Sequence, residues 1–494
     1  MLYIGVDLGT SSVKLLLMDE KGDIKSIVTR EYPLSLPKPG WSEQNPEDWW
    51  TQLVDGLGEL LKDADKSQVD GISFSGQMHG LVILDENDNV IRPAILWNDG
   101  RTQEECDYLN KTIGREVISS YTANMALTGF TAPKILWVKK HEPENFAKIA
   151  KIMLPKDYIA YKLSGVHCTD VSDASGMLLL DVKNKKWSKE MIELCGIRED
   201  QLATLHESYQ PVGTVLPEIA KLLGIPETTK VVAGGGDQAV GAVGTGTVGD
   251  GMCSVSLGTS GTVFIATDNF AVDDNNALHM FAHASGKYHF MGCTLAAAAS
   301  NKWWMDEIIR NKNYPEEQKG ITDDKLGKNN VYYLPYLMGE RTPHNDPNAR
   351  GTFIGMVMDT TREDMTQAVL EGVAFSLRDA LEIARSFGVK IERVRINGGG
   401  SKSPLWCKII ANVMNVKVDK INSAEGPAFG AAILAAVGCG QYATVEEATS
   451  KLIQVVETTD QTPELVEAYN KKYSVYTALY PALKDTYKKL VEAE

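Results

Sequence analysis

Short apolar runs that end in glycine-rich turns are the dominant pattern of this chain. Residues 2–6 are apolar and lead into Asp7-Leu-Gly-Thr-Ser-Ser, and residues 13–18 form a second apolar run. A third run, at 24–30, follows a turn that contains a glycine, so the first thirty residues predict a β-hairpin extended by a third strand. Residues 69–73 predict another buried strand, which delivers Gly76-Gln-Met-His-Gly at its end.

Segments with helical periodicity separate these strands. Asn45-Pro46 predicts the start of a helix that continues to about Lys62, because proline is favoured at the first helical position. Within residues 361–388, apolar residues recur at helical spacing between a starting and a stopping signal. The tail after about Thr458 is charged and predicts a surface helix. Strands that alternate with helices indicate an α/β protein.

The turn after the first strand recurs near the middle of the chain. Asp7-Leu-Gly-Thr-Ser matches Ser256-Leu-Gly-Thr-Ser, and each follows an apolar strand. This repeat predicts two similar α/β domains, 1–246 and 247–494, that face each other across a cleft and are joined at the glycine-rich segment 246–251. Coincidence in a chain with 43 glycines is the alternative. Because only the first copy carries an acid, the two domains are expected to differ in chemistry.

Composition and charge exclude several classes of protein. The 494 residues are 43% hydrophobic and 23% charged, which is typical of globular proteins and excludes disorder and coiled coils. The net charge of −15 argues against nucleic acid as a partner. Seven scattered cysteines predict neither a disulfide framework nor a thiolate zinc site. We find no signal peptide and no apolar run of about 18 residues, so a cytoplasmic protein without a membrane partner is expected.

Four glycine-rich turns lie at the ends of apolar strands and suit the binding of phosphate groups. Glycine lets backbone N–H groups approach phosphate oxygens, and neighbouring hydroxyl groups add donors. Together they predict a nucleotide between the two domains. The chain has no P-loop motif, and the G-x-G-x-x-G at 244–249 lacks a following helical pattern, which disfavours a dinucleotide site. The four turns begin at Gly9, Gly234, Gly258 and Gly398.

Three charged residues beside these turns are candidates for catalysis or metal binding. Asp7 suits Mg²⁺, which binds carboxylates and substrate phosphates, and a turn-capping role is the alternative. Lys14 is either a phosphate ligand or an exposed hairpin lysine. Asp237 follows three glycines, which let a ligand approach, so it is a candidate general base; a helix N-cap is the alternative.

Polar residues at strand ends indicate a site for a polyhydroxylated ligand. His79 lies in a glycine-flanked loop at the end of a strand, where ligands bind in α/β proteins, although a lone histidine is more often structural. Trp97-Asn98-Asp99 offers an aromatic wall and polar groups. His279 and His283 are four residues apart, but no third ligand is evident, which disfavours a zinc site.

The motifs occur in the order found in a known family. The chain resembles the FGGY carbohydrate kinases, and among them the bacterial xylulose kinases, from its first residues to about Gly438. Besides the turns named above, the motifs that carry this resemblance are Gly76-Gln-Met-His-Gly, Leu96-Trp-Asn-Asp-Gly-Arg, Gly129-Phe-Thr-Ala-Pro-Lys, Leu154-Pro-Lys-Asp-Tyr, Gly234-Gly-Gly-Asp-Gln-Ala and Gly339-Glu-Arg-Thr-Pro-His.

This resemblance implies two actin-like (ribonuclease-H-like) ATPase domains that flank a deep cleft, with the sugar in the cleft and ATP mainly on the second domain. It implies Mg²⁺-dependent transfer of the γ-phosphoryl group of ATP to the 5-hydroxyl group of D-xylulose, and a homodimer. Closure of the domains around the sugar is expected to exclude water. The alternatives are an FGGY kinase for another ketose or polyol, such as ribulose or glycerol, and an actin- or chaperone-like nucleotide switch.

The resemblance also assigns expected roles to individual residues. Asp237 matches the general base, Asp7 the carboxylate associated with Mg²⁺, and Met78 and His79 the sugar contacts. Asn98 and Gln238 are further candidates for the sugar, although Gln238 departs from the asparagine of many relatives. The residues expected to bind the nucleotide are Thr10, Ser11, Lys14, Gly258, Thr259, Gly399, Gly400 and Ser401.

Overall fold

The computed structural model describes residues 1–422 and 425–493, which form two compact units. Unit 1 comprises Met1–Val248, Met280–Tyr288 and Glu425–Gln454, and unit 2 holds the rest of the described chain. The first segment of unit 1 ends at Val248, close to the expected domain boundary at residue 246. The division differs further along the chain, because two segments of the second half pack in unit 1.

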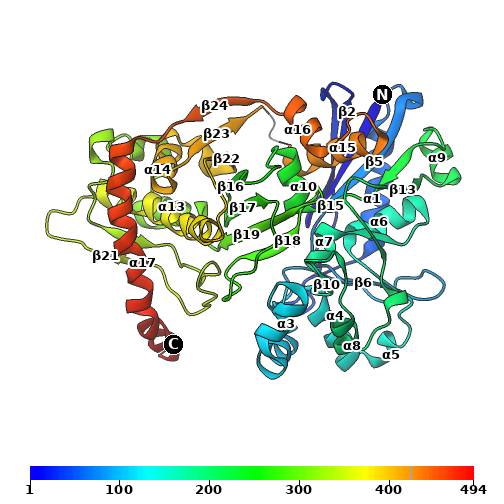
Figure 1. Cartoon of the computed structure of the whole chain (residues 1–494), viewed down its shortest axis with the longest axis horizontal. Helices are drawn as coiled ribbons and strands as arrows, with labels where there is room; N and C mark the ends of the chain where they lie inside the picture. The colour runs from blue at the N-terminus through cyan, green and yellow to red at the C-terminus, as the bar shows by residue number, and fades with distance from the viewer. Residues whose placement is uncertain (423–424, 494) are drawn as a thin grey trace. The chain divides into compact units, whose positions relative to one another are not determined.

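Unit 1 is built on a sheet that contains the predicted N-terminal strands (Figure 1). Its central strand β1 pairs antiparallel with β2 and parallel with β5, so both neighbours come from the expected apolar runs. The apolar side chains of these strands are buried in one core with those of the helix that follows Asn45. The strands, in sheet order, are β13 (Pro211–Thr214), β14 (Lys230–Val232), β5 (Val69–Gly76), β1 (Leu2–Leu8), β2 (Ser12–Asp19) and β3 (Ile24–Glu31).

Unit 2 repeats this plan. Its strand β16 pairs antiparallel with β17 and parallel with β22, as β1 pairs with β2 and β5. The parallel pair β22–β23 and the antiparallel pair β23–β24 correspond to β5–β14 and β14–β13. The strands of unit 2, in sheet order, are β19 (Tyr288–Thr294), β17 (Gly261–Thr267), β16 (Cys253–Leu257), β22 (Arg393–Asn397), β23 (Lys417–Ile421) and β24 (Val455–Thr459). Strand β18 (His279–Ala282) falls mostly in the segment of unit 1 that begins at Met280. The predicted α/β repeat is therefore confirmed.

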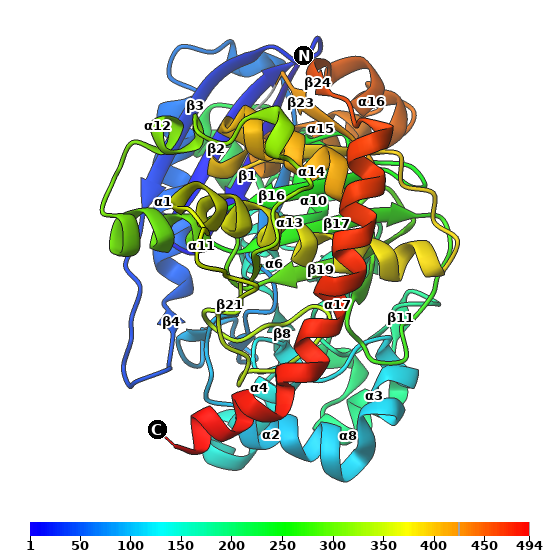
Figure 2. The same ribbon diagram turned by 90° about the vertical axis from the view of Figure 1, so that its left-hand side faces the viewer.

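The predicted helices begin at the expected capping residues. Helix α1 (Pro46–Leu60) is capped by Asn45, and α13 (Arg362–Ser386) by Thr361. The C-terminal tail forms α17 (Pro463–Glu492), which runs beside α14 (Pro404–Met414) (Figure 2). Tyr469, Tyr476 and Tyr487 of α17 are buried, so this helix contributes to the core of unit 2 as well as to its surface.

Helix α15 (Gly426–Cys439) packs on β1 and β5 and therefore belongs to unit 1 (Figure 1). Glycines allow this close approach. A Cβ atom on Gly5 of β1 would lie 2.0 Å from the carbonyl oxygen of Ala428, and one on Gly430 would lie 2.0 Å from that of Val240. Val240 belongs to α10 (Asp237–Gly244), so α15 contacts both the sheet and the helix that begins at Asp237. This packing explains why a simple division at residue 246 does not describe the compact units.

Among the described residues, no helix is both long enough and apolar enough to cross a membrane.

The remaining α-helices and strands complete the two units. In unit 1 the remaining elements are β4 (Glu43–Gln44), β6 (Val82–Leu84), β7 (Ala94–Ile95), α2 (Gln103–Asp107), α3 (Arg115–Thr122), α4 (Thr131–His141), α5 (Pro143–Phe146), β8 (Lys151–Met153), α6 (Pro155–Ser164), β9 (Cys168–Asp170), α7 (Val171–Ser175), β10 (Leu180–Asp181), β11 (Lys186–Trp187), α8 (Lys189–Cys195), β12 (Thr204–His206), α9 (Pro217–Leu223), β15 (Gly235–Gly236) and α16 (Val445–Leu452). In unit 2 they are α11 (Ala298–Trp303), α12 (Tyr314–Gln318), β20 (Tyr332–Leu334) and β21 (Thr352–Ile354).

Candidate active site

Asp237 is the first residue of α10 and follows a glycine turn that only glycine can form. Gly234 has a positive φ of 72°, and a Cβ atom there would lie 2.2 Å from the carbonyl oxygen of Phe74. The next two glycines form β15, which pairs with the end of β5. This turn places Asp237, a half-buried residue, beside the end of β5.

Asp7 lies close enough to Asp237 to influence its ionisation. Asp7 is on β1, opposite Ser75 of β5, whose hydroxyl group donates a hydrogen bond of 3.0 Å to Asp7 Oδ1. Burial raises the pKa of Asp7 to about 6. Burial and the neighbouring Asp7 raise the pKa of Asp237 to about 7, while hydrogen bonds from Gln238 act in the opposite direction. Asp237 is therefore a carboxylate that accepts a proton near neutral pH.

His79 is held in a conformation that few residues other than glycine adopt. Its φ is 70°, and its carbonyl oxygen accepts hydrogen bonds from Thr131 Oγ1 (3.0 Å) and Lys134 Nζ (2.8 Å). The ring Nδ1 lies 2.8 Å from the carbonyl oxygen of Gly176, which can only accept, so Nδ1 carries a proton. In a neutral ring, Nε2 is then an acceptor for a hydroxyl group. The protein thus fixes both the position and the tautomer of His79.

Two glycines, which have no side chain, allow the candidate sugar contacts Met78 and His79 to lie close to the backbone that leads to Asp237. A Cβ atom on Gly176 would lie 2.4 Å from His79 Nδ1, and one on Gly236, next to Asp237, would lie 2.9 Å from Met78 Sδ. Met78 and His79 therefore pack directly against backbone that leads into α10 and out of α7. Met78, His79 and Asp237 therefore lie close together in unit 1, and their common role in sugar binding stays a prediction.

The remaining candidates for the sugar lie at the edges of this group. Gln238 follows Asp237 and hydrogen bonds to it, so it acts on the candidate base directly. Asn98 is exposed, in a loop between Trp97 and the buried Asp99. The Trp97 indole donates a hydrogen bond of 2.9 Å to Thr10 Oγ1, which places the predicted aromatic wall beside the first glycine turn.

The three predicted phosphate ligands of unit 1 all have partners within the protein. Besides the bond from Trp97 to its hydroxyl group, Thr10 accepts a hydrogen bond of 2.6 Å from Gln44 Nε2 at its carbonyl oxygen. Lys14 Nζ forms an ion pair of 2.9 Å with Glu425. Ser11 is exposed, and its backbone carbonyl oxygen accepts a hydrogen bond of 3.3 Å from the Tyr32 N–H. A phosphate group at this turn would therefore compete with Glu425 for Lys14.

Unit 2 contains a cavity of about 740 Å³ where the second copy of the glycine turn meets the loop after β22. Of the predicted nucleotide-binding residues, Thr259, Gly399 and Gly400 line it. Gly258 accepts a hydrogen bond of 2.8 Å from the backbone N–H of Ala298 and so supports the wall. The hydroxyl group of Ser401 donates to the carbonyl oxygen of Gly398, 2.7 Å away, within its own turn.

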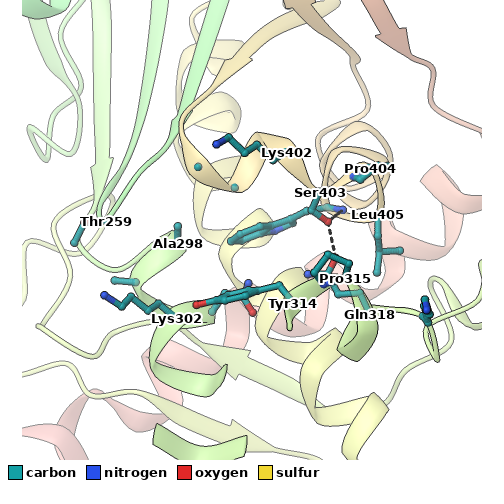
Figure 3. Close-up of a pocket in the computed structure, with 16 residues that line it drawn as sticks. Thr259, Ala298, Lys302, Tyr314, Pro315, Gln318, Lys402, Ser403, Pro404 and Leu405 are labelled. Carbon is teal, nitrogen blue, oxygen red and sulfur yellow. Dashed lines mark hydrogen bonds between the residues drawn. The ribbon is translucent and has the colours of Figure 1, made fainter. Parts of the chain in front are cut away.

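Several lining residues were not predicted from the sequence, because they lie on helices without a recognisable motif. Figure 3 shows Lys302 and Tyr314 across the cavity from Lys402 and Ser403. The Ser403 hydroxyl group donates a hydrogen bond of 2.6 Å to Gln318 Oε1, which ties the loop after β22 to α12. Basic side chains and apolar surfaces together suit a ligand with a flat ring and negative charge, such as a nucleotide. The apolar surfaces come from Pro315, Leu405 and Trp406.

Comparisons with known proteins identify the family of the chain. The N-terminal and C-terminal domain models of the FGGY family of carbohydrate kinases match residues 2–244 and 253–439. The chain is 40% identical to a xylulose kinase of Bacillus subtilis, over 98% of this chain and 97% of the relative.

Two solved structures have the same fold. A Brucella ovis protein described as a "xyloylose kinase" has a TM-score of 0.93 and 38% identity, over 98% of this chain and all of its own. A gluconate kinase of Lactobacillus acidophilus has the same TM-score at 26% identity, over 99% of both chains. The chain therefore belongs to the FGGY family of carbohydrate kinases.

Proposed function

We propose that the protein transfers the γ-phosphoryl group of ATP to the 5-hydroxyl group of D-xylulose, with Asp237 as the general base. The observation that carries this proposal is the grouping of Asp237 with Met78 and His79 around two glycines in unit 1. A carboxylate with a pKa of about 7, on a residue that is only half-buried, can take the proton of a sugar hydroxyl group. The choice of D-xylulose is supported by the similarity to relatives that are named xylulose kinases.

His79, Met78, Asn98 and Gln238 are proposed to contact the sugar. The hydroxyl groups of a ketose are donors as well as acceptors, and a His79 ring with its only proton on Nδ1 would accept a hydrogen bond at Nε2. His79 is rigidly held by α4 and by Gly176, so it can discriminate between hydroxyl positions. Domain closure around the sugar stays a prediction, as does the homodimer.

ATP is proposed to occupy the cavity of unit 2. Gly399, Gly400 and Ser403 would lie against the nucleoside, while Gly258, Thr259 and Lys302 would face the phosphates. Ser401 would act by holding the turn, since its hydroxyl group binds Gly398. Thr10, Ser11 and Lys14 are proposed to contact the transferred phosphoryl group from unit 1.

The residues around Asp7 fit a magnesium ion. Its carboxylate provides the hard oxygen ligand that Mg²⁺ prefers, and burial near a second carboxylate raises the cost of leaving both acids ionised without a cation. When bound with ATP, Mg²⁺ would offset the negative charge of the phosphates. Asp7 would hold the ion, and Asp237 would remain the group that accepts the proton.

Release of ADP in the presence of ATP and Mg²⁺ tests the substrate. We would compare D-xylulose, D-ribulose, L-ribulose, glycerol, xylitol, gluconate and no sugar. The highest kcat/KM with D-xylulose and little turnover without sugar are expected. A higher value with gluconate or another polyol would replace the proposed substrate and keep the chemistry. Turnover that is independent of sugar would favour a nucleotide switch.

Gly399→Val is expected to raise the KM for ATP at least tenfold and leave the KM for sugar unchanged. A Cβ atom at Gly399 would meet nothing within 4 Å, so the new side chain enters the cavity without disturbing the protein. Steady-state kinetics measure both constants. Gly388→Val is the control, because it also adds a valine where a Cβ atom would meet nothing within 4 Å, but outside the cavity. Gly388 has a positive φ of 86°, so this control variant is expected to lose more stability than Gly399→Val. An unchanged KM for ATP in Gly399→Val would place the nucleotide elsewhere.

Gly176→Ala is expected to raise the KM for sugar and leave the KM for ATP unchanged. The added methyl group would lie 2.4 Å from His79 Nδ1 and 3.0 Å from Met78 Cε, so both side chains must shift. The backbone of Gly176 is right-handed, with a φ of −81°, and accepts alanine. Kinetics across the same sugars provide the measurement. An unaltered KM for every sugar would remove His79 and Met78 from the sugar site.

A further inference from the structure

We propose that Ser172 is a positioning residue for Asp237. This inference rests on the proposed function, because it assigns the means by which the general base is held. Ser172 lies on α7, a short helix that is far from Asp237 in the sequence. Its side chain is buried and accepts a hydrogen bond from the backbone of the glycine turn.

A chain of hydrogen bonds joins the glycine turn to a buried ion pair. The backbone N–H of Gly236, the residue before Asp237, donates to Ser172 Oγ at 3.2 Å. The Ser172 hydroxyl group in turn donates to Asp170 Oδ2 at 2.5 Å. Asp170 is paired with the buried Lys156, whose Nζ lies 3.0 Å from Asp170 Oδ1. The turn is thus anchored to a charged group inside the protein rather than to mobile surface atoms.

The fit between Ser172 and the turn depends on glycine at position 235. A Cβ atom there would lie 2.7 Å from Ser172 Oγ, so a larger residue would displace the hydroxyl group. Ser172 is itself fixed because its backbone N–H donates to Asp170 Oδ2 at 2.8 Å. Residues at both ends of α7 therefore contact the site. Ser172, near its start, accepts a hydrogen bond from the turn before Asp237, and Gly176, just after its end, accepts one from the His79 ring.

The physical reason for a role in catalysis is the geometry that proton transfer requires. The Gly236 N–H lies at the start of a helix, where the backbone has no partner within the helix. Without Ser172 this buried donor would be unsatisfied, and the turn would move to find another partner. A shift of about 1 Å in a reacting group can cost about 10²-fold in rate. Loss of the Ser172 hydroxyl group should therefore act on kcat.

Ser208 provides a matched control. Its hydroxyl group is equally buried and donates to the same oxygen, Asp170 Oδ2, at 2.7 Å. Ser208 contacts the turn through its backbone carbonyl oxygen, which accepts from the Gly234 N–H at 2.9 Å and is kept in the alanine variant. Its hydroxyl group also lies 3.4 Å from Ser172 Oγ, but the side chain that accepts from the Gly236 N–H is Ser172. Ser172→Ala and Ser208→Ala thus each remove one hydrogen bond to Asp170, but the first also removes the partner of the turn. A purely structural role predicts the same behaviour for both variants.

The experiment measures kcat, both KM values and Tm for the two variants. We expect similar decreases in Tm, a kcat about 10-fold to 100-fold lower in Ser172→Ala, unchanged KM values, and near-normal kcat in Ser208→Ala. Ser172→Cys fills the same space but forms only weak hydrogen bonds, so it should show the same loss and serves if the alanine variant does not fold. Equal kcat values for Ser172→Ala and Ser208→Ala would overturn the proposal.

Asp237→Asn, measured beside these variants, separates this inference from the proposed function. If Asp237→Asn is nearly inactive while Ser172→Ala and Ser172→Cys turn over normally, the base stands and the role of Ser172 is refuted. If Asp237→Asn retains normal turnover, both the base and its positioning residue are refuted.

Discussion

Replacing Asp237 with asparagine is expected to lower the kcat of sugar-dependent ATP turnover by about 10²–10⁴-fold, the range typical for loss of a general base. The amide keeps the size of the side chain, and no cap is lost because the N-cap of α10 is Gly236, but the amide cannot take a proton from the sugar. Burial and Asp7 already make the charged form of Asp237 costly, as its pKa of about 7 indicates. The variant should therefore fold with an undiminished Tm.

Two measurements distinguish a catalytic loss from an indirect one. The Kd for ATP should be unchanged in Asp237→Asn, since the cavity that we assign to ATP is lined by residues of unit 2. Asp364→Asn makes the same change in the first turn of another helix, α13, and should retain wild-type turnover. Turnover by Asp237→Asn within a few-fold of wild type would exclude Asp237 as the base.

Replacing Lys156 with methionine is expected to lower the free energy of unfolding by about 3–5 kcal/mol, the typical cost of removing one partner of a buried ion pair. Lys156 Nζ lies 2.6 Å from Asp157, 3.0 Å from Asp170 and 3.8 Å from Asp173, and all four side chains are buried. Neither carboxylate oxygen of Asp173 has a hydrogen-bond partner among the described residues. Methionine would leave three buried acids without a cation.

The loss of stability should depend on pH in a defined direction. Burial raises the pKa of Asp157 and Asp173 even beside Lys156, and loss of the ammonium group would raise both further. A carboxyl group whose pKa is higher in the folded state destabilises the fold as the pH rises above its unfolded value, here 3.8. Lys156→Met should therefore be less stable, relative to wild type, at about pH 8 than at about pH 5.5.

Urea denaturation at the two pH values provides this measurement, and Lys162→Met is the matched control. Lys162 lies on the same helix, α6, but its ion pair with Glu47, at 3.1 Å, is partly exposed. A surface pair contributes only about 0–1 kcal/mol. Equal losses in the two variants, or a loss in Lys156→Met that does not change with pH, would show that Lys156 does not compensate the buried acids.

The sequence predicted the features that depend on local pattern. The apolar runs and glycine turns predicted β1, β2, β5 and their counterparts β16, β17 and β22, because strand periodicity and turn formation involve neighbouring residues. The motifs also predicted that Asp237 and His79 lie where strands end. Capping residues such as Asn45 and Thr361 marked the starts of helices for the same reason.

Contacts between distant residues were decided only by the tertiary structure. The return of α15 to unit 1 depends on Gly5 and Gly430, whose importance appears only when the two backbones meet. Lys134 ends one of the quoted motifs, but the motif does not show that Lys134 is buried, that burial lowers its pKa to about 7, or that it binds the carbonyl oxygen of His79. Desolvation depends on the whole surrounding structure, so no local pattern reveals it.

The candidate site also combines local features with contacts between distant residues. The sequence by itself determined which reactive side chains are present and where they stand in the local pattern: Asp7 and Asp237 lie beside glycine turns, and His79 lies at the end of a strand. Only the tertiary structure decided that Asp7 lies near enough to raise the pKa of Asp237, and that Ser172 meets the turn before it. Electrostatic and hydrogen-bond interactions act over a few ångströms in space, whatever the separation along the chain.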